Sequence, residues 1–364
     1  MTALFKPYTL KGVTLRNRIA VPPMCQYSAV DGLVNDWHES HYTSIARGGP
    51  GLVIVEATAV APEGRISPGC LGLWNDEQAA GLQRVAAAIK AGGAVPGIQI
   101  AHAGRKASAN KPWEGDDHIP SDAGGWDIIG PSAVAFGKHL PKVPQAMSKD
   151  DIARVTQNFV DAAVRARDAG FEWLELHFAH GYLAQSFFSV EANQRTDEYG
   201  GSFEGRSRFI LETLAAVRKV WPEDLPLTAR FGVIEYDGRD EQTLNEAIAL
   251  TRAMREGGLD MLNVSVGFST PNGNVPWGSA FLAPIAERVR KEAGVPVASS
   301  WGIDDPQVAN RVVADQQMDL VMIGRAFLSN PHYAYHAAMA LKQEQPSWVL
   351  PAPYAHWLER YQRG

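Results

Sequence analysis

Two histidines and a tyrosine, His177, His180 and Tyr182, stand close together at the predicted end of a strand. Residues 174–177 alternate between apolar and polar types, and alternate residues of a strand face opposite sides of the sheet. Gly181 then frees the backbone to turn. Two imidazoles can bind a carbonyl or anionic oxygen, and a phenol can give up a proton. These side chains predict a catalytic site, unless they are hydrogen-bonded structural residues.

The same histidines could instead bind a metal ion. Zinc would need a third ligand, typically Asp, Glu, His or Cys, and Glu175 is available. The chain has neither an HExxH motif nor a separated His-x-His pair to support such a site. We therefore predict no metal site. A metal-dependent barrel hydrolase that uses His177 and His180 is kept as the alternative enzyme.

The rest of the chain alternates between strand-like and helix-like segments. Strands are expected at 19–22, 52–57, 97–101, 173–177, 227–232, 261–266, 295–299 and 320–324. Helices are expected at 38–48, 76–92, 149–169, 205–220, 241–257, 280–293, 306–315 and 332–343. Asp76, Ser148 and Asp240 are the predicted N-caps. Eight strands, each followed by a helix, predict an α/β fold of the (β/α)8 TIM-barrel type. A doubly wound sheet is the alternative, but no GxGxxG motif opens a βαβ unit.

Other strand ends carry polar residues that a barrel would bring to the same mouth. Gln99 and Arg230 alternate with apolar neighbours and should face the barrel interior. An inward Arg230 needs an anionic partner or solvent. Cys25 follows the first strand, where a lone cysteine is usually a small buried hydrophobe but can also contact and tune a cofactor.

The last two strands end in segments suited to an anion, Ser299-Ser300-Trp301-Gly302 and Gly324-Arg325. Barrels often bind a phosphate between these two loops. Glycine lets backbone amides approach the anion, and arginine adds a bidentate fork. The pair therefore predicts a phosphate site at the barrel mouth.

We expect a single domain over residues 1–364, with three additions to the barrel. Residues 5–18 predict an N-terminal hairpin that plugs the barrel from below. Residues 104–147 are rich in Gly, Pro, Asp and Ser, and so long a connection after the third strand predicts an excursion over the mouth. Residues 347–364 form an aromatic tail. The tail could dock onto its own barrel or onto another subunit.

Composition excludes several classes of protein. The net charge of −6 and the lack of a basic cluster argue against nucleic-acid binding. Two cysteines make no disulfide framework and suit a reducing cytosol. The chain lacks both a run of eighteen apolar residues and a signal-peptide core, so we expect no membrane partner and a cytoplasmic location.

Over nearly its whole length, the chain resembles the Old Yellow Enzyme family of flavin reductases, most closely the bacterial subgroup that contains xenobiotic reductase A. The motifs that carry the resemblance are Pro22-Pro23-Met24-Cys25-Gln26-Tyr27, Gln99-Ile100-Ala101-His102-Ala103-Gly104-Arg105, His177-Phe178-Ala179-His180-Gly181-Tyr182-Leu183, Arg195-Thr196-Asp197-Glu198-Tyr199-Gly200-Gly201-Ser202, Arg206-Ser207-Arg208-Phe209 and Gly324-Arg325.

The resemblance implies an enzyme that holds FMN without a covalent bond. NADPH or NADH would reduce the flavin, which would then reduce the C=C bond of an α,β-unsaturated carbonyl or nitro compound. A flavin-binding protein without catalysis is the other alternative. The implied FMN contacts are Pro23, Met24, Cys25, Ala57, Gln99, Arg230, Trp301, Gly302, Gly324 and Arg325.

The resemblance also implies roles for the central residues. His177 and His180 would bind the substrate carbonyl oxygen, and Tyr182 would donate the proton. Tyr27, Trp301 and Trp357 would line the substrate site. His180 and Cys25 mark the subgroup, because many family members carry Asn and Thr at these positions. In the subgroup the tail reaches a neighbouring site, which implies a homodimer or higher oligomer with tail exchange through Trp357.

Overall fold

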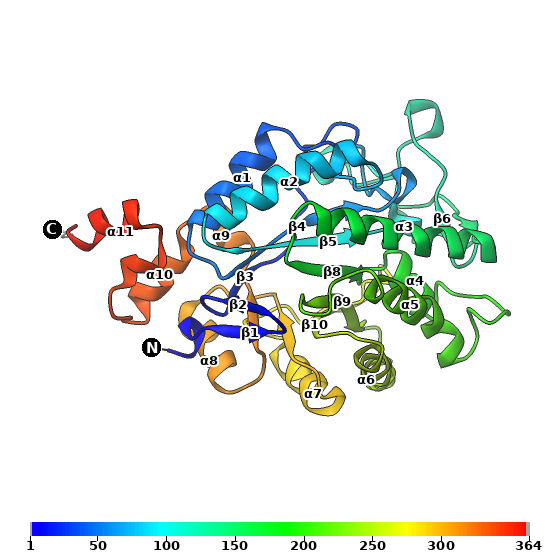
Figure 1. Cartoon of the computed structure of the whole chain (residues 1–364). Coiled ribbons are helices and arrows are strands. Elements are labelled where there is room, and N and C mark those ends of the chain that lie inside the picture. The colour runs from blue at the N-terminus through cyan, green and yellow to red at the C-terminus, as the bar shows by residue number, and fades with distance from the viewer. Residues whose placement is uncertain (1, 362–364) are drawn as a thin grey trace.

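The computed structural model describes residues 2–361 and confirms the predicted TIM barrel (Figure 1). Eight parallel strands close in the order β10-β11-β12-β3-β4-β5-β8-β9. Their bounds are β3 Ile19–Val21, β4 Leu52–Ala59, β5 Val95–Ala101, β8 Trp173–Phe178, β9 Leu227–Ile234, β10 Met261–Val266, β11 Val297–Ser299 and β12 Leu320–Met322. All eight predicted strands are present, with ends that differ by up to two residues.

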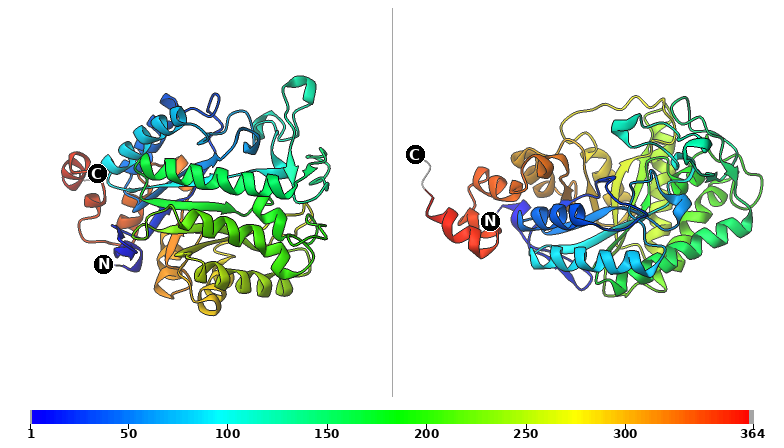
Figure 2. Two further views of the ribbon diagram at one scale, coloured as in Figure 1. Left: turned by 45° about the vertical axis from the view of Figure 1, so that its right-hand side comes forward. Right: turned by 90° about the horizontal axis from the view of Figure 1, so that it is seen from above.

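Helices surround the barrel, and all of the long ones cover the outer faces of the strands (Figures 1 and 2). Their bounds are α1 Asp36–Arg47, α2 Asp76–Ala91, α3 Lys149–Asp168, α4 Leu183–Phe188, α5 Phe203–Arg218, α6 Asp240–Glu256, α7 Ala283–Ala293, α8 Pro306–Ala314, α9 Arg325–Ser329, α10 Tyr333–Ala340 and α11 Ala352–Glu359. None of the helices in the described part of the chain is long and apolar enough to cross a membrane.

One of the three predicted helix caps is confirmed. Ser148 caps α3 through a capping box with Asp151. The prediction for α2 is wrong by one residue, because Asn75 accepts the hydrogen bond from the backbone of Gln78. The prediction of Asp240 as a cap is also wrong, because Asp240 lies in the first turn of α6. Its negative charge interacts favourably with the helix dipole there.

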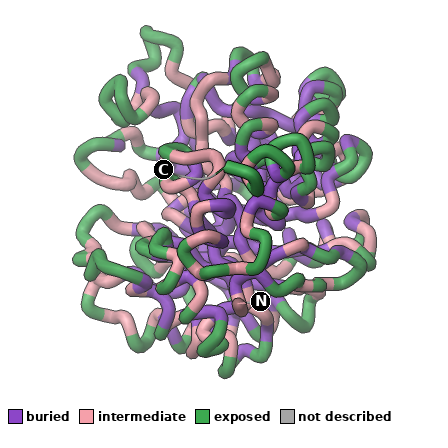
Figure 3. Tube along the Cα trace, turned by 90° about the vertical axis from the view of Figure 1, so that its left-hand side faces the viewer, coloured by how far each residue is buried: buried purple, intermediate pink, exposed green. Residues whose placement is uncertain are grey.

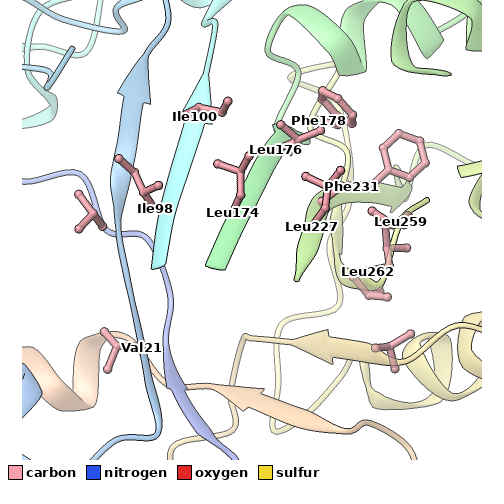
Figure 4. Close-up of a cluster of buried hydrophobic side chains, with 14 of the residues drawn as sticks. Val21, Ile98, Ile100, Leu174, Leu176, Phe178, Leu227, Phe231, Leu259 and Leu262 are labelled. Carbon is pink, nitrogen blue, oxygen red and sulfur yellow. The ribbon is translucent and has the colours of Figure 1, made fainter. Parts of the chain in front are cut away.

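Strand alternation divides the apolar residues into two layers. Ile98, Ile100, Leu174 and Leu176 belong to the large core between strands and helices (Figure 4). A smaller core inside the lower barrel includes Trp173, together with Val13, Leu15, Leu52, Ile54, Met261 and Leu320. Val13 and Leu15 come from the hairpin of β1 (Tyr8–Leu10) and β2 (Val13–Leu15), which closes the lower end of the barrel as predicted.

The excursion after β5 carries the short paired strands β6 (Ile129–Gly130) and β7 (Gln145–Ala146). At the other end of the chain, α11 packs on the 3-10 helix η6 (Pro346–Val349) and stands away from the barrel in Figures 1 and 2. Half-buried and exposed residues prevail there, as Figure 3 shows from the side of the termini. Residues 362–364 of the predicted tail lie outside the described residues.

Candidate active site

The end of β8 brings the two histidines and the tyrosine together. After Phe178 the chain turns sharply, because His180 and Gly181 adopt left-handed φ angles of 61° and 68°. The ring centroids of His177 and His180 lie 5.0 Å apart, and those of His177 and Tyr182 lie 4.9 Å apart. All three side chains therefore form one cluster at the barrel mouth.

Hydrogen bonds determine which nitrogen of each imidazole can donate. The backbone N–H of Ala179 donates to Nδ1 of His177 at 3.3 Å, so the ring proton of His177 lies on Nε2. Nε2 of His180 lies 2.9 Å from the hydroxyl of Ser265. When this hydroxyl donates, the proton of His180 lies on Nδ1. Each ring then keeps one N–H donor.

Burial controls the charge of these groups. Burial, followed by the nearby Arg230 cation, holds the pKa of His177 and of His180 well below the usual range. Both imidazoles are therefore neutral donors at neutral pH. Burial raises the pKa of Tyr182 well above its usual value, so its phenol keeps its proton.

A polar network forms the floor under these rings. Gln99 donates to Glu175 at 2.8 Å, and Asn263 donates to the second carboxylate oxygen at 2.9 Å. Burial lowers the pKa of Arg230, and the nearby Glu175 carboxylate opposes this, so Glu175 is an anionic neighbour of Arg230. Both carboxylate oxygens of Glu175 therefore already accept hydrogen bonds from other side chains. Among residues 2–361, no group of three His, Cys, Asp or Glu side chains could hold a metal ion, so the geometry gives no support to a metal-dependent hydrolase.

A cavity of about 320 Å³ opens above this floor. The predicted cofactor contacts Pro23, Met24, Arg230, Trp301, Gly302, Gly324 and Arg325 all line it, with His180 at one side. Arg230 donates to Ser300 at 3.1 Å, but its buried Nε has no hydrogen-bond partner. A buried guanidinium N–H without a partner indicates that a ligand acceptor belongs there.

Backbone geometry shapes the end of the cavity where the sequence predicts a phosphate site. Trp301 and Gly302 have successive left-handed φ angles of 79° and 65°. A Cβ on Gly302 would lie 2.2 Å from the backbone oxygen of Gly278, and a Cβ on Gly324 would lie 3.0 Å from Sδ of Met24. Larger residues would therefore disturb the walls of this cavity.

A second cavity of about 320 Å³ shares His180 with the first and is also lined by Tyr182. Its far wall includes Lys106 and Phe136 from the excursion, so residues 104–147 do reach the mouth. Lys106 donates to the backbone oxygens of His180 at 2.7 Å and Phe268 at 2.9 Å. Burial, then the charge of Arg105, lowers the pKa of Lys106 to about 7.

The other predicted residues lie at different distances from this centre. Burial, followed by the nearby Cys25 and Tyr182, raises the pKa of Tyr27, so Tyr27 lies in the same neighbourhood as these two residues. Ala57 lines a small pocket that also touches Tyr182. Trp357 lies on α11 with 71% of its surface exposed and packs edge-on against His356, so its own chain does not bring it to the site.

Sequence reasoning missed several residues of the site. Asn263 and Ser265 alternate with apolar residues along β10, and this pattern could have predicted that both face the interior. Ser300 was seen only as part of a phosphate loop. Lys106 had no local signal, because its contacts come from residues 74 and 162 positions away.

Comparisons with known proteins agree with this geometry. Residues 3–344 match the model of the NADH:flavin oxidoreductase / NADH oxidase family. An NADPH dehydrogenase of Geobacillus thermodenitrificans is 42% identical over 95% of this chain and 97% of its own length. One from Halalkalibacterium halodurans is 40% identical over 93% and 94%.

Two solved structures share the fold. Morphinone reductase superposes with a TM-score of 0.79 at 26% identity, covering 93% of this chain and 90% of that one. A 2-naphthoyl-CoA reductase superposes with a TM-score of 0.84 at 23% identity, covering 96% of this chain and 53% of that one. The second likeness concerns the fold alone.

The fold and site define a flavin-dependent barrel oxidoreductase, and the chain belongs to the NADH:flavin oxidoreductase / NADH oxidase family, the Old Yellow Enzyme family. It is an NAD(P)H-dependent flavin oxidoreductase, with FMN as cofactor and NADPH or NADH as reductant. The residues present fit FMN, since the unpaired Nε of Arg230 and the glycines of the cavity offer donors and room.

Proposed function

We propose that this enzyme is an ene reductase, which reduces the C=C bond of α,β-unsaturated carbonyl compounds and of related nitro compounds. One observation carries the proposal. Two neutral imidazole donors and one protonated phenol converge beside the cavity that suits FMN. Such a set binds one oxygen and delivers one proton, which is what reduction of an enone requires.

Most of the proposed cofactor contacts line the cavity, whereas Cys25, Ala57 and Gln99 lie outside its lining and are kept from the family resemblance. Arg230 and Gln99 would bind the polar edge of the flavin ring, and Pro23, Met24, Cys25 and Ala57 would line its path. The backbone of Gly302 and Gly324 and the guanidinium of the exposed Arg325 would bind the phosphate. FMN, when bound, supplies the hydride chemistry.

The protein supplies binding and proton transfer. His177 and His180 donate hydrogen bonds to the substrate carbonyl, and these strengthen as negative charge develops on its oxygen. Neutral imidazoles suit this role because they add no net charge that would bind anions indiscriminately. Tyr182 then gives its proton to the carbon next to the carbonyl, while Tyr27 and Trp301 enclose the substrate.

A two-step anaerobic assay tests the function. NADPH should bleach the yellow protein, and cyclohex-2-enone should then restore the oxidised flavin spectrum and yield cyclohexanone. Reoxidation by oxygen alone, with no response to enones, maleimides or nitro compounds, would leave an NAD(P)H oxidase and reject the proposal.

Cys25→Ser should keep turnover but shift the flavin reduction potential. Burial raises the pKa of the Cys25 thiol well above its usual value, so it acts as a neutral, polarizable neighbour and not as a nucleophile. A spectroscopic redox titration measures the shift, and steady-state assays measure turnover. Loss of turnover with FMN still bound would instead make Cys25 catalytic.

We also propose a homo-oligomer in which the tail completes a neighbouring site. Tyr354, Trp357 and Tyr361 are 41%, 71% and 64% exposed, an aromatic composition that interface cores favour. Prolines 351 and 353 stiffen the segment and lower the cost of ordering it. Trp357 is the residue assigned to the partner's substrate pocket, because indole combines a large flat face with one donor.

Truncation after Ser347 should weaken subunit association and alter enone preference together, because it removes the whole aromatic tail. Light scattering measures the mass, and a substrate panel measures preference. Trp357→Ala should change preference with a smaller effect on association. A truncated protein with unchanged mass and unchanged preference would show that the tail only covers its own subunit.

A further inference from the structure

A buried carboxyl with no role in the proposed reaction, that of Glu56, lies directly behind the loop that carries Cys25 and Tyr27. Glu56 is fully buried. A β-bulge in β4 sets its direction: Val55 pairs with Ile98 and Thr58 with Ile100, so β4 holds one extra residue. Plain alternation would turn Glu56 toward the barrel interior. The bulge turns its carboxyl to α1 and the loop instead.

Both carboxyl oxygens are used. The backbone N–H of Gln26, between Cys25 and Tyr27, donates to Oε2 of Glu56 at 2.7 Å. The hydroxyl of Tyr42 donates to Oε1 at 3.2 Å and accepts from the backbone N–H of Glu56 at 2.9 Å. The carboxyl thus joins the loop to the side of the barrel.

The loop needs this support because its backbone is strained. Tyr27 has a left-handed φ of 51°, which is unfavourable for a residue with a Cβ. A Cβ on Gly69 would lie 2.4 Å from the backbone oxygen of Tyr27, so the neighbouring segment already packs tightly on the loop. Glu56 holds the loop next to the strained Tyr27, through the hydrogen bond from Gln26.

We propose that Glu56 is a positioning residue, whose carboxyl holds the loop of Cys25 and Tyr27 against the flavin and substrate site. This rests on the proposed function for the roles of Cys25 and Tyr27. The attachment of the loop to Glu56, called the clamp below, rests on the bulge in β4 and on the three hydrogen bonds.

The groups that face Glu56 offer no positive charge that would stabilise a carboxylate there. From α1 these are Tyr42 and His38, whose Nε2 lies 3.8 Å from Oε1, and from the loops they are the thiols of Cys25 and Cys70. Burial lowers the pKa of His38 to about 4, so its ring is neutral. His41 packs edge-on against Tyr42, and burial lowers its pKa to about 4 as well.

Burial accordingly raises the pKa of Glu56 to about 8, and the bond from Gln26 opposes this rise. Glu56 is thus largely protonated at neutral pH and ionises in mildly alkaline solution. The clamp then gains a negative charge beside Cys25, a change that the flavin spectrum can report.

The test compares holoenzymes of Glu56→Gln, Glu56→Ala and Tyr42→Phe with the wild type. Thr58→Val is the matched control, because its buried hydroxyl bonds the backbone oxygen of Glu56 at 2.8 Å without touching the loop. The first measurement is the rate of Cys25 alkylation by iodoacetamide, located by peptide mass. The second is the visible flavin spectrum as a function of pH.

Alkylation should be roughly tenfold faster in Glu56→Ala, because the loop loses a buried hydrogen bond. Glu56→Gln should stay near the wild-type rate, since its amide oxygen can still accept from Gln26. The wild-type spectrum should show a step near pH 8 that Glu56→Gln lacks. Tyr42→Phe should move this step to higher pH, because the lost hydroxyl stabilised the carboxylate.

Wild-type alkylation in Glu56→Ala, or the same pH profile in Glu56→Gln as in the wild type, would overturn the proposal. If Glu56→Ala does not fold, the spectra of the other two variants decide. Neither measurement uses an enone, so failure of the ene reductase proposal would appear separately, as a flavin that enones do not reoxidise.

Discussion

Tyr182→Phe is expected to slow flavin reoxidation by an enone by about 10²–10⁴-fold, the usual contribution of a positioned general acid. Reduction of the flavin by NADPH should remain close to the wild-type rate. The reason is that the proton is needed only after hydride has reached the substrate. Stopped-flow absorbance of the two half-reactions measures both rates.

Two further observations sharpen this prediction. Because burial raises the pKa of Tyr182 well above its usual value, the wild-type oxidative rate should show no inflection from its loss of a proton near neutral pH. Tyr199→Phe is a control, since its hydroxyl bonds Glu212 at 2.8 Å on the outer surface. Equal losses in both half-reactions of Tyr182→Phe would show that this residue positions a ligand instead of donating a proton.

His177→Ala and His180→Ala are each expected to lower kcat/KM for an enone by about 10²–10³-fold, as loss of one oxyanion donor does. Phenol binding, followed by the flavin charge-transfer band, should weaken in both variants while FMN stays bound. The double variant should lose less than the product of the two single losses, because both donors act on one oxygen.

The charge state of these histidines gives an independent check. Their pKa values are held well below the ordinary range, so both rings are neutral at and above neutral pH. The two histidines should therefore add no step of their own to the pH dependence of ligand affinity in the ordinary histidine range, and any step near pH 7 would come from Lys106. His139→Ala, at an exposed position of the excursion, is the control. Unchanged phenol affinity in both alanine variants would remove these histidines from the substrate site.

Periodicity alone determined the barrel and the facing of its strands. Gln99 and Arg230 turn inward while Ile98 and Ile100 pack outward, because side chains of a strand alternate wherever the strand is regular. The clustering of His177, His180 and Tyr182 was also local information, since one sharp turn separates them. Such features depend on neighbours in the chain, and a sequence displays these directly.

Contacts between distant segments decided the rest. The proton position on His180 depends on Ser265, which lies 85 residues further along the chain. Glu175, available from sequence as a metal ligand, is bound instead by Gln99 and Asn263, from two other strands. Packing of the closed barrel sets these pairings, and no local pattern encodes them.

The extra residue in β4 shows the same division most directly. The sequence Val53-Ile54-Val55-Glu56-Ala57 determined a strand, and its regular alternation would have turned Glu56 inward. Only the pairing of β4 with β5 contains the bulge that turns the carboxyl to Tyr42 and Gln26. Residue types thus determined which groups could bind, donate or titrate, and strand register and packing decided which of them meet, because a shift of one residue exchanges the two faces of a strand.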